Sequence, residues 1–473
     1  MNEVEISCDT VVIGAGTAGL AAFKEANARA FTVLIESGPL GTTAQRTGDT
    51  PMTLLLEAGR SAHELSRTAV HGVRVGSGYA LDTSGVMNAL RSVRARATTE
   101  VLSYMYRIPE GQRLMGRASF IDDHHVRVGD EYRVTFKTAV IATGSAPVVP
   151  YELRDLKGVL TTDTFFDQDR LPEAVAVVGS GSVGLELGQA LHNLGVRVAV
   201  FGNGRLWRFS DDTVIPVAYE LLQESFPLTI TSTLTAIEES PSGHVALYYL
   251  DEALFENYLE VDAVVAAAAR APRTAGLNLK AAGVELDKSG RIAVDPLTLQ
   301  TSMAHIFAAG DVALEENTSH VARLTGQMAG RNAATFPVVH RMQPISRLNL
   351  LFTEPGLAIV GRTLDEMKER ARKGAPFVCS EVRLDGGRFR ILRREGGIIR
   401  IYTDVESHQI LGSELCCTGA EHLAHFLSLC LSRGLTVEEV AAFPCFQPCL
   451  EEALVSSARA AVKTLNRKSV THV

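Results

Sequence analysis

The chain has 473 residues, of which 46% are hydrophobic and 21% are charged, and this composition excludes a disordered protein. Its length predicts about two to four domains. The formal net charge of −8 gives no basic footprint, which argues against nucleic acid as a partner.

The first glycine-rich turn lies between a short apolar strand at residues 11–13 and the start of a helix. Its glycines, Gly14, Gly16 and Gly19, permit a tight turn and close backbone approach, so a pyrophosphate can lie at the helix N-terminus. The next strand, at residues 32–35, ends in Glu36, whose carboxylate can accept hydrogen bonds from a ribose. Strand, turn, helix and acid in this order predict a dinucleotide-binding fold.

A second glycine-rich turn, with Gly179, Gly181 and Gly184, follows the apolar strand at residues 175–178 and predicts a second nucleotide fold. The strand after it does not end in an acid; Arg205 and Arg208 follow instead. Without the carboxylate there is no repulsion against a 2′-phosphate, and arginines can pair with that phosphate. The pattern weakly favours NADPH over NADH; the alternative is that both arginines are solvated surface charges.

Two further strands lie on either side of the second nucleotide fold. The first ends in the small-residue turn of Thr143 and Gly144, which suits a crossover out of the first domain. The other ends in Gly310 and Asp311, and this aspartate either bonds a flavin ribityl hydroxyl or is a plain turn residue. The second domain is therefore predicted to be inserted into the first. The expected domains are 1–149 and 277–343 for the first nucleotide fold, 150–276 for the second, and 344–473 for a C-terminal domain.

Neither the histidines nor the cysteines form the pattern of a metal site. His422 and His425 lie on a predicted amphipathic helix at residues 421–431 without further ligands, so we predict no metal site. Seven cysteines, an odd number without zinc-site spacing, predict reduced thiols. With no secretory signal and no run of roughly 18 apolar residues, we expect a soluble cytoplasmic protein without a membrane span.

Together these motifs resemble the class I pyridine nucleotide-disulfide oxidoreductases, and dihydrolipoamide dehydrogenase most closely. The resemblance also covers the helix start at residues 185–188 and the segment at residues 352–355. It implies an α/β fold with two Rossmann-like dinucleotide-binding domains, as in glutathione reductase, and a C-terminal α+β dimerisation domain. It further implies FAD on the first glycine turn, with Thr42 and Thr43 beside it, and NAD(P)H on the second. Glu186 matches the family's glutamate beside the nicotinamide, and the protein is expected to be a homodimer whose C-terminal tail completes the partner's active site.

The chain departs from the family at the redox-active loop, residues 41–51. The family's two cysteines fall on Ala44 and Asp49, and its lysine falls on Thr53. The family's catalytic histidine, in the C-terminal tail, falls on Gln447, while the supporting acid remains as Glu452. Passing electrons from flavin to a disulfide needs two thiols and a group that titrates near neutrality, and these residues supply neither. Reduction of lipoamide, glutathione or mercuric ion by the usual route is therefore not expected.

The thiols missing from the loop could in principle lie elsewhere in the chain. The candidates for a relocated dithiol are Cys445 with Cys449 and the adjacent pair Cys416 and Cys417. Packing as small apolar residues is the commoner role of free cysteines. The separation of Cys445 from Cys449 across Pro448 also argues against ready closure.

Asp49 has two interpretations. Buried near the flavin, its carboxyl could act as a base; otherwise it forms a salt bridge to Arg46 or caps a helix.

Three functions follow from these observations. The first is an FAD-dependent NAD(P)H oxidoreductase that passes electrons to a small non-disulfide acceptor such as a quinone. The second is a flavin-dependent dehydrogenase or oxidase of a small organic substrate, with Asp49 as the base. The third is a catalytically idle flavoprotein that serves as a scaffold or redox sensor. The retained Glu186 and second glycine turn argue against the third.

Overall fold

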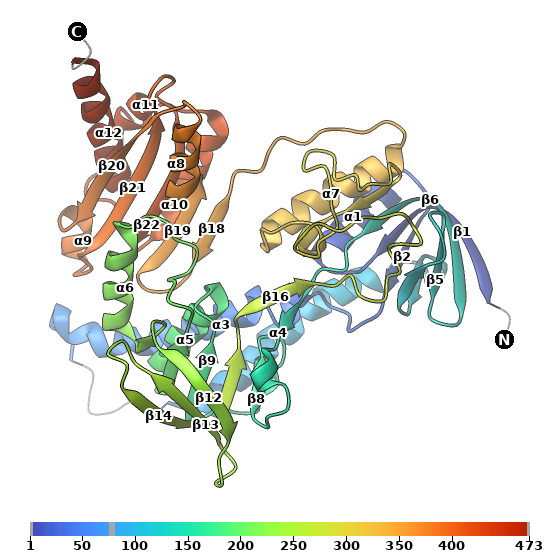
Figure 1. Cartoon of the computed structure of the whole chain (residues 1–473), viewed down its shortest axis with the longest axis horizontal. Helices are drawn as coiled ribbons and strands as arrows, with labels where there is room; N and C mark the ends of the chain where they lie inside the picture. The colour runs from blue at the N-terminus through green and yellow to red at the C-terminus, as the bar shows by residue number, and fades with distance from the viewer. Residues whose placement is uncertain (1–2, 75–80, 471–473) are drawn as a thin grey trace.

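The computed structural model describes residues 3–74 and 81–470, and its three largest sheets are a mixed sheet, a parallel sheet and an antiparallel sheet (Figure 1). In Figure 1 the first sheet lies on the right, the second at the lower centre and the third at the upper left. The predicted architecture of two dinucleotide-binding folds and a third α+β domain is therefore confirmed.

The first sheet has β1 at its centre, and β1 pairs in parallel with both β2 and β6. β17, which lies after the second nucleotide fold in the sequence, pairs in parallel with the carboxyl-terminal half of β6. The strands are β3 (Arg113–Met115), β2 (Thr32–Glu36), β1 (Val4–Ile13), β6 (Tyr132–Ile141), β5 (His125–Val128), β4 (Ala118–Phe120) and β17 (Ile306–Ala308).

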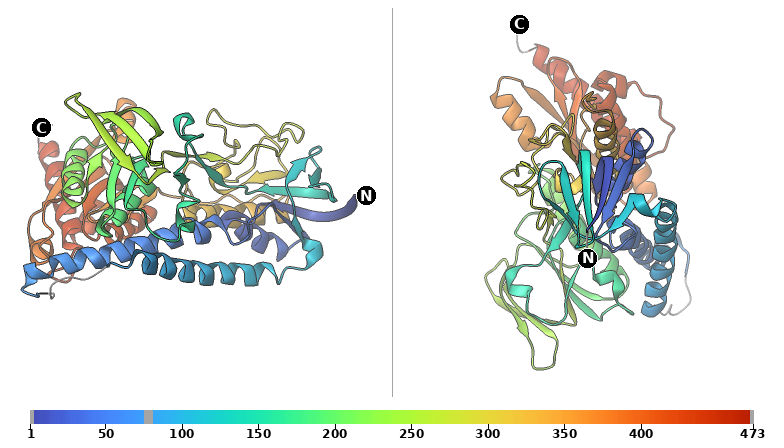
Figure 2. Two further views of the ribbon diagram at one scale, coloured as in Figure 1. Left: turned by 90° about the horizontal axis from the view of Figure 1, so that it is seen from below. Right: turned by 90° about the vertical axis from the view of Figure 1, so that its right-hand side faces the viewer.

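Helices α1 (Thr17–Asn27) and α7 (Ser319–Thr335) pack against each other in the first domain. Two long helices, α3 (Asp49–Arg67) and α4 (Thr83–Met105), follow the short α2 (Thr43–Arg46). Figure 2 shows α3 and α4 running side by side from the first sheet towards the third domain. The α3 helix begins at the altered loop and packs against α5 (Ser182–Asn193) of the second domain.

The second sheet is wholly parallel, and its central strand β9 lies between β10 and β15. Its strands are β11 (Leu228–Thr229), β10 (Arg197–Phe201), β9 (Ala174–Val178), β15 (Ala263–Ala266) and β8 (Val159–Thr161). Helices α5 (Ser182–Asn193) and α6 (Val214–Ser225) belong to it. A small antiparallel sheet of β12 (Thr233–Glu239), β13 (Val245–Leu250) and β14 (Glu256–Val261) follows, and β7 (Ser145–Val148) pairs with β16 (Ala269–Pro272) where the chain enters and leaves this domain.

The third sheet is antiparallel, and its central strand β22 lies between β19 and β21. Its strands are β18 (Leu348–Leu351), β19 (Gly356–Gly361), β22 (Ile410–Cys417), β21 (Gly397–Asp404) and β20 (Phe377–Leu384). The accompanying helices are α8 (Leu364–Arg372), α9 (Gly387–Ile391), α10 (Ala420–Arg433), α11 (Val437–Ala441) and α12 (Glu452–Val470). One buried apolar cluster joins α3, α5 and α6 to this sheet, so the second and third domains share a core.

A buried polar network fastens the loop after β10 to the third sheet. Asp211 is fully buried and accepts hydrogen bonds from the Arg400 guanidinium at 3.0 Å and the Tyr402 hydroxyl at 2.8 Å. Although burial alone would raise it, the pKa of the Asp211 carboxyl lies below its usual value because the backbone N–H of Thr213 and these two donors bond the carboxylate. Glu414, also fully buried, accepts hydrogen bonds from the backbone N–H groups of Ser210 and Leu364. Because each carboxylate is well bonded, the loop has one fixed position relative to the third domain.

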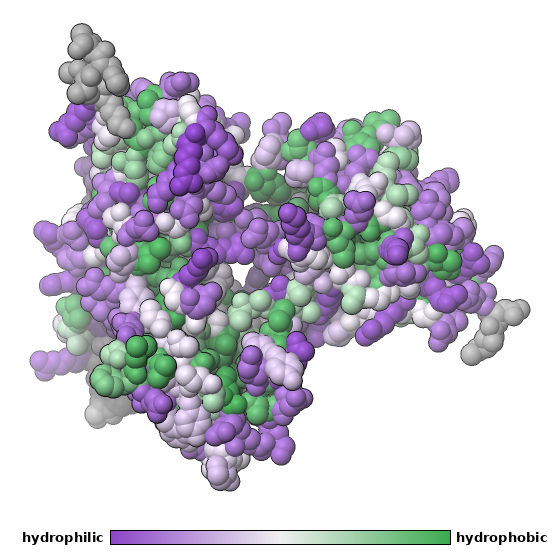
Figure 3. Space-filling view, in the orientation of Figure 1, coloured by the Kyte–Doolittle hydropathy of each residue, from purple (hydrophilic) through white to green (hydrophobic). Residues whose placement is uncertain are grey.

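The surface is mixed in character. Figure 3 shows hydrophilic and hydrophobic residues interspersed over the face turned to the viewer, and a hollow between the right-hand lobe and the rest of the molecule. Within residues 3–74 and 81–470, no helix is both long enough and apolar enough to cross a bilayer.

Candidate functional site

The first glycine turn is built so that two of its glycines are needed for packing and one faces open space. A Cβ on Gly14, which has a φ of +104°, would lie 2.4 Å from the carbonyl oxygen of Ala142. A Cβ on Gly19 would lie 1.7 Å from the carbonyl oxygen of Gly14. A Cβ on Gly16, the N-cap of α1, would meet nothing within 4 Å. The helix N-terminus is therefore open to an anion at Gly16, as an FAD pyrophosphate requires.

Glu36 lies beside this turn, at the end of β2. Its carboxylate accepts hydrogen bonds from the backbone N–H of Ala15 at 2.6 Å and of Gly38 at 2.9 Å. A carboxylate has about four lone-pair positions, so these two bonds leave capacity for a ribose hydroxyl. The residue stands where the prediction of a ribose acceptor requires it.

The small-residue turn after β6 and the Gly-Asp turn after β17 meet at Ser145. The Ser145 hydroxyl donates to the Asp311 carboxylate at 2.6 Å, and it accepts from the Arg270 guanidinium at 3.0 Å. The Thr143 hydroxyl donates to the carbonyl of Arg273 at 2.7 Å, and the Arg273 N–H donates to the carbonyl of Gly144 at 2.9 Å. The structure thus brings the predicted residues Thr143, Gly144 and Asp311 to the junction of the first two domains.

The second glycine turn repeats the design of the first. A Cβ on Gly179, at a φ of +133°, would lie 2.5 Å from the Ala267 carbonyl oxygen, and one on Gly184 would lie 1.8 Å from the Gly179 carbonyl oxygen. A Cβ on Gly181 would meet nothing within 4 Å, so the N-terminus of α5 is open in the same way. Residues 267 and 268 therefore pack on this turn as residues 142 and 143 pack on the first.

The two predicted arginines have different surroundings. Arg205 is exposed beyond the end of β10, and its backbone carbonyl accepts the Ser180 hydroxyl at 2.8 Å, while its guanidinium has no ion pair among the described residues. Arg208 lies 3.6 Å from a carboxylate oxygen of Glu316, which precedes α7. Arg205 is therefore available to a 2′-phosphate, whereas Arg208 already has a partner.

Between these arginines lies Trp207, whose role the sequence did not suggest. It is nearly buried, its backbone is in the left-handed region with a φ of 53°, and its indole N–H donates to the Ser182 hydroxyl at 2.8 Å. Ser182 is the first residue of α5, so the indole lies at the open end of the second glycine turn.

Binding of NAD⁺ or NADP⁺ is expected to change the fluorescence of Trp207, because a pyrophosphate at the N-terminus of α5 would compete for the Ser182 hydroxyl. Trp207 is the chain's single tryptophan, so the signal is unambiguous. A titration of tryptophan emission measures the affinity for NAD⁺ and the affinity for NADP⁺. In Gly181→Val the valine side chain would occupy the open space at the N-terminus of α5, so the nucleotide should no longer change the fluorescence of Trp207. An equal fluorescence change in that variant would show that the nucleotide does not bind at this turn.

The altered loop is held by an unusual residue at the start of α2. Thr42 is a β-branched residue with φ 58° and ψ 148°, a conformation that costs energy for a residue other than glycine. Its hydroxyl accepts from the backbone N–H of Gln45 at 3.3 Å, which caps α2. Thr43 begins α2, Ala44 follows it, and Asp49 begins α3.

The surroundings of Asp49 differ from the interpretation in which it is a buried base. Its side chain is exposed, because the first turn of α3 presents residues 49 and 53 outward while Pro51 and Met52 pack inward. Its carboxylate accepts a hydrogen bond from the Ser319 hydroxyl at the start of α7, and no described ion pair joins it to Arg46. Gly48 is the N-cap, so Asp49 lies in the first turn, where the helix dipole favours a negative charge.

Glu186 is the buried acid of the site. It is 8% exposed in the first turn of α5, and one carboxylate oxygen accepts the backbone N–H of Phe352 at 2.9 Å. Burial raises the pKa of Glu186 to about 7; the Phe352 N–H opposes this rise, and the charge of Asp49 adds to it. No lysine or arginine within the described residues forms an ion pair with Glu186, so its neutral form is favoured.

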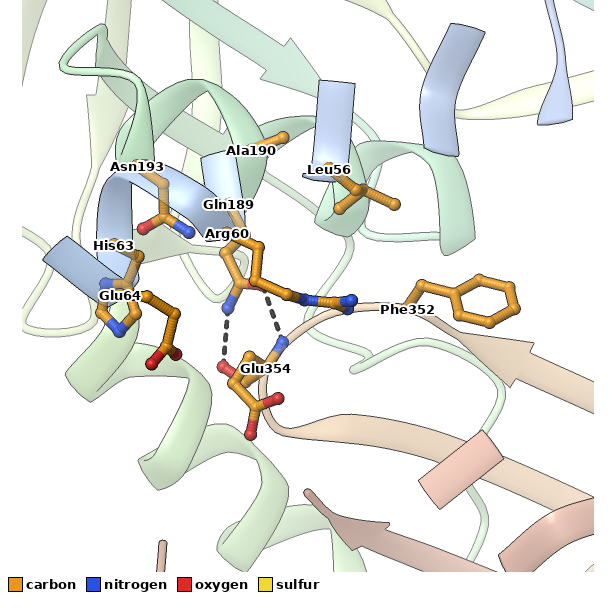
Figure 4. Close-up of a pocket in the computed structure, with 9 residues that line it drawn as sticks. All are labelled: Leu56, Arg60, His63, Glu64, Gln189, Ala190, Asn193, Phe352 and Glu354. Atoms are coloured by element: carbon orange, nitrogen blue, oxygen red, sulfur yellow. Dashed lines mark hydrogen bonds between the residues drawn. The ribbon is translucent and has the colours of Figure 1, made fainter. Parts of the chain in front are cut away.

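One turn further along α5, Gln189 fixes the same loop. Its side-chain amide donates to the Glu354 carbonyl at 2.8 Å, and its carbonyl accepts the Glu354 N–H at 2.7 Å. Figure 4 shows both bonds beside a cavity of about 10 Å³, between α3, α5 and residues 352–354. This cavity holds about one water and is no cofactor site. Glu186 and Gln189 thus clamp the segment at residues 352–354 onto α5.

In the part of the chain that the structure describes, the predicted residues of the C-terminal tail form no hydrogen bonds with the predicted residues on α3 and α5. Gln447 is exposed, and Glu452 accepts the backbone N–H of Cys449 at 3.1 Å at the start of α12. Within the described chain, no hydrogen bond joins either residue to Asp49 or Glu186.

All seven cysteines are free thiols in the structure. Cys416 and Cys417 are adjacent on β22, so their side chains point to opposite faces, and burial raises the pKa of both. The thiolate is the reactive form, so these buried thiols are inert. The pKa of Cys449 is also raised, and no bond joins it to Cys445.

Comparisons with known proteins agree with this geometry. Residues 8–329 match the model of the pyridine nucleotide-disulphide oxidoreductase family, and residues 349–458 match that family's dimerisation domain. Mercuric reductase of Staphylococcus aureus is 29% identical over 446 residues, which are 91% of this chain and 78% of that protein. Dihydrolipoyl dehydrogenase of Staphylococcus aureus is 27% identical over 477 residues, 98% of each chain.

Among solved structures, the Cu(II) complex of the HOCl-induced flavoprotein disulfide reductase RclA from Escherichia coli has a TM-score of 0.80 at 20% identity. The alignment covers 97% of this chain and 99% of that one, and it shows a shared fold. The predicted glutathione reductase-like fold is confirmed. The family uses FAD and NAD(P)H, which fit the two open glycine turns. The chain belongs to the pyridine nucleotide-disulphide oxidoreductase family.

Proposed function

We propose that this protein is an FAD-dependent NAD(P)H oxidoreductase without a dithiol relay, which passes electrons to a non-disulfide acceptor such as a quinone. The observation that carries the proposal is the start of α2 and α3, where Ala44 and Asp49 stand in the positions of the family's two thiols. The relay's other half is altered too, because Gln447 does not titrate. When bound, FAD supplies hydride acceptance from the nicotinamide and release of electrons to the acceptor.

The chain's own residues divide the work of binding and orientation. Gly16 and Gly181 leave the N-termini of α1 and α5 open to the two pyrophosphates, and Glu36 and Asp311 offer carboxylate oxygens to sugar hydroxyls. Glu186 holds the segment beginning at Phe352 against α5 through a carboxyl that is largely neutral below about pH 7.

Turnover measurements with different acceptors test the proposal. Purified protein with FAD should oxidise NADH or NADPH when a benzoquinone is the acceptor. With lipoamide, oxidised glutathione or Hg²⁺, the rate should not exceed that of free FAD, because no thiol pair is present to exchange with the substrate. Lipoamide-dependent turnover above that background would contradict the proposal, and inactivity with both nucleotides would favour an idle flavoprotein.

We propose NADPH as the preferred nucleotide, although the structure leaves one arginine in support of this preference where the sequence suggested two. No acid ends β10, and Arg205 is exposed beyond it, but Arg208 lies 3.6 Å from a carboxylate oxygen of Glu316, a negative charge that weakens its attraction for a phosphate. The preference therefore depends on Arg205. The tryptophan titration compares NADP⁺ with NAD⁺ directly.

We propose that the protein functions as a homodimer. The match of residues 349–458 to a dimerisation domain supports this assembly. Phe446, beside Gln447 in the C-terminal tail, is 84% exposed, more than any other large apolar side chain among the described residues, and an interface at the tail would cover it. In the dimer, the tail with Gln447 and Glu452 would complete the site of the partner subunit.

A further inference from the structure

A cluster of two histidines and one aspartate lies at the edge of the first domain, away from the nucleotide turns. Asp123 and His124 belong to the turn between β4 and β5, and His305 immediately precedes β17. One ligand atom from each lies within 4.8 Å of the others. His305 is at the amino end of β17, whereas Asp311 of the cofactor site follows its carboxyl end.

Within the described residues, one nitrogen of each imidazole forms a hydrogen bond and the other forms none. His124 Nδ1 lies 3.0 Å from the carbonyl oxygen of Phe136, and His305 Nε2 lies 2.8 Å from the carbonyl oxygen of Asp123. A carbonyl only accepts, so in the neutral rings these nitrogens carry the protons. The lone pairs are therefore on His124 Nε2 and His305 Nδ1. Metal-binding histidines are typically oriented in this way by carbonyl oxygens.

The neighbouring contacts select Asp123 as the third ligand. Asp122 is already engaged, because its carboxylate accepts the His124 N–H at 2.8 Å and bonds His125 Nδ1 at 2.8 Å. The side-chain carboxylate of Asp123 has no such partner among the described residues. The rings of His124 and His305 stack with centroids 4.4 Å and planes 16° apart, so one ring must turn out of the stack before both lone pairs can point at one ion.

We propose that Asp123, His124 and His305 bind one divalent transition-metal ion of the zinc class, with water as the fourth ligand. Two imidazoles and a carboxylate suit Zn²⁺ better than Mg²⁺ or Ca²⁺, which prefer oxygen ligands only. Tetrahedral Zn²⁺ with bonds of about 2.0 to 2.1 Å needs ligand atoms about 3.3 Å apart. The ligands must therefore close from within 4.8 Å, and the rings must tilt, which the exposed His124 on its turn permits.

The position of the site indicates a structural role. The ion would join the β4–β5 turn to the start of β17, the strand that leads to Asp311. An ion that binds only the folded chain stabilises it by mass action. Zinc is thus expected to raise the unfolding temperature of the first domain without taking part in electron transfer.

Zinc binding to the untagged, FAD-containing protein tests the inference, with Zn²⁺ itself as the probe in equilibrium dialysis and thermal unfolding. We expect one ion per chain and a rise in melting temperature. Asp123→Asn and His124→Ala should each weaken binding by about tenfold or more, as loss of metal-site residues does. The matched control is His422→Ala, an exposed histidine beside Glu421 on α10, which should bind Zn²⁺ as the parent does.

Two results would overturn the assignment. One is less than one bound Zn²⁺ per chain, which would leave a stacked histidine pair without a ligand role. The other is unchanged affinity in both Asp123→Asn and His124→Ala, which would place the ion elsewhere. Both variants change an exposed or half-exposed turn, and circular dichroism verifies that each is folded.

Discussion

Replacing Gly16 with valine is expected to give a folded protein that has lost most of its FAD. A Cβ at this position meets nothing within 4 Å, and the backbone, with φ −73° and ψ −174°, is open to any residue, so the chain itself tolerates the change. The side chain would instead fill the space at the N-terminus of α1 that a pyrophosphate needs. A loss of only about 1.4 kcal/mol of binding free energy weakens the affinity tenfold.

The measurement is the ratio of flavin to protein absorbance, together with far-ultraviolet circular dichroism. The matched control is Gly19→Ala, whose Cβ would lie 1.7 Å from the Gly14 carbonyl oxygen, so that variant should be unfolded or strongly destabilised. A Gly16→Val protein with a full complement of FAD would show that the cofactor does not lie on this turn.

Replacing Glu186 with glutamine is expected to stabilise the protein at alkaline pH and to have little effect at acidic pH. Burial raises the pKa of this carboxyl from 4.5 in the unfolded chain to about 7 in the folded one. The contribution of this carboxyl to the free energy of unfolding is therefore fully present below pH 4.5, where it is protonated in both states, and is lost as the pH rises through 7. A shift of this size corresponds to about 3 kcal/mol. Glutamine does not ionise, and its side-chain oxygen can still accept the Phe352 N–H.

Urea unfolding at pH 5 and pH 8 measures the difference between the two proteins. The variant should be more stable at pH 8 by up to about 3 kcal/mol, with the gain shrinking towards pH 5. Glu57→Gln is the control, because Glu57 is exposed beside Arg60 and should show no such gain. If the parent instead becomes more stable than Glu186→Gln as the pH rises, the carboxyl is ionised and paired in the folded protein.

The parts of the fold that the sequence predicted correctly depend on local signals. Each glycine turn lies between a strand and a helix, so Gly14, Gly16 and Gly19 could be placed without knowledge of distant residues. The small-residue turn of Thr143 and Gly144 could be placed for the same reason, since it directly follows an apolar strand. The domain limits at residues 149, 276 and 343 stay predictions.

The parts that the sequence did not predict depend on contacts between distant residues. The bond from Phe352 to Glu186 spans 166 positions, and the proposed metal cluster joins His305 to a turn about 180 residues earlier. The hydrophobic periodicity of a sequence shows local structure and predicts neither of these distant contacts. The two interpretations of Asp49 also could not be separated from the sequence, because a helix-start aspartate has the same local sequence whether its turn faces inward or outward.

The central claim is that the bound flavin of this protein has no disulfide partner. An anaerobic titration of the FAD-containing protein with dithionite, followed by absorbance, tests it directly. A disulfide takes up two electrons in addition to those of the flavin. The structure has no cysteine at positions 44 and 49, and its seven thiols are free, so full reduction should need two electrons per FAD with no long-wavelength charge-transfer band. Uptake of four electrons per FAD, or appearance of that band, would contradict the account.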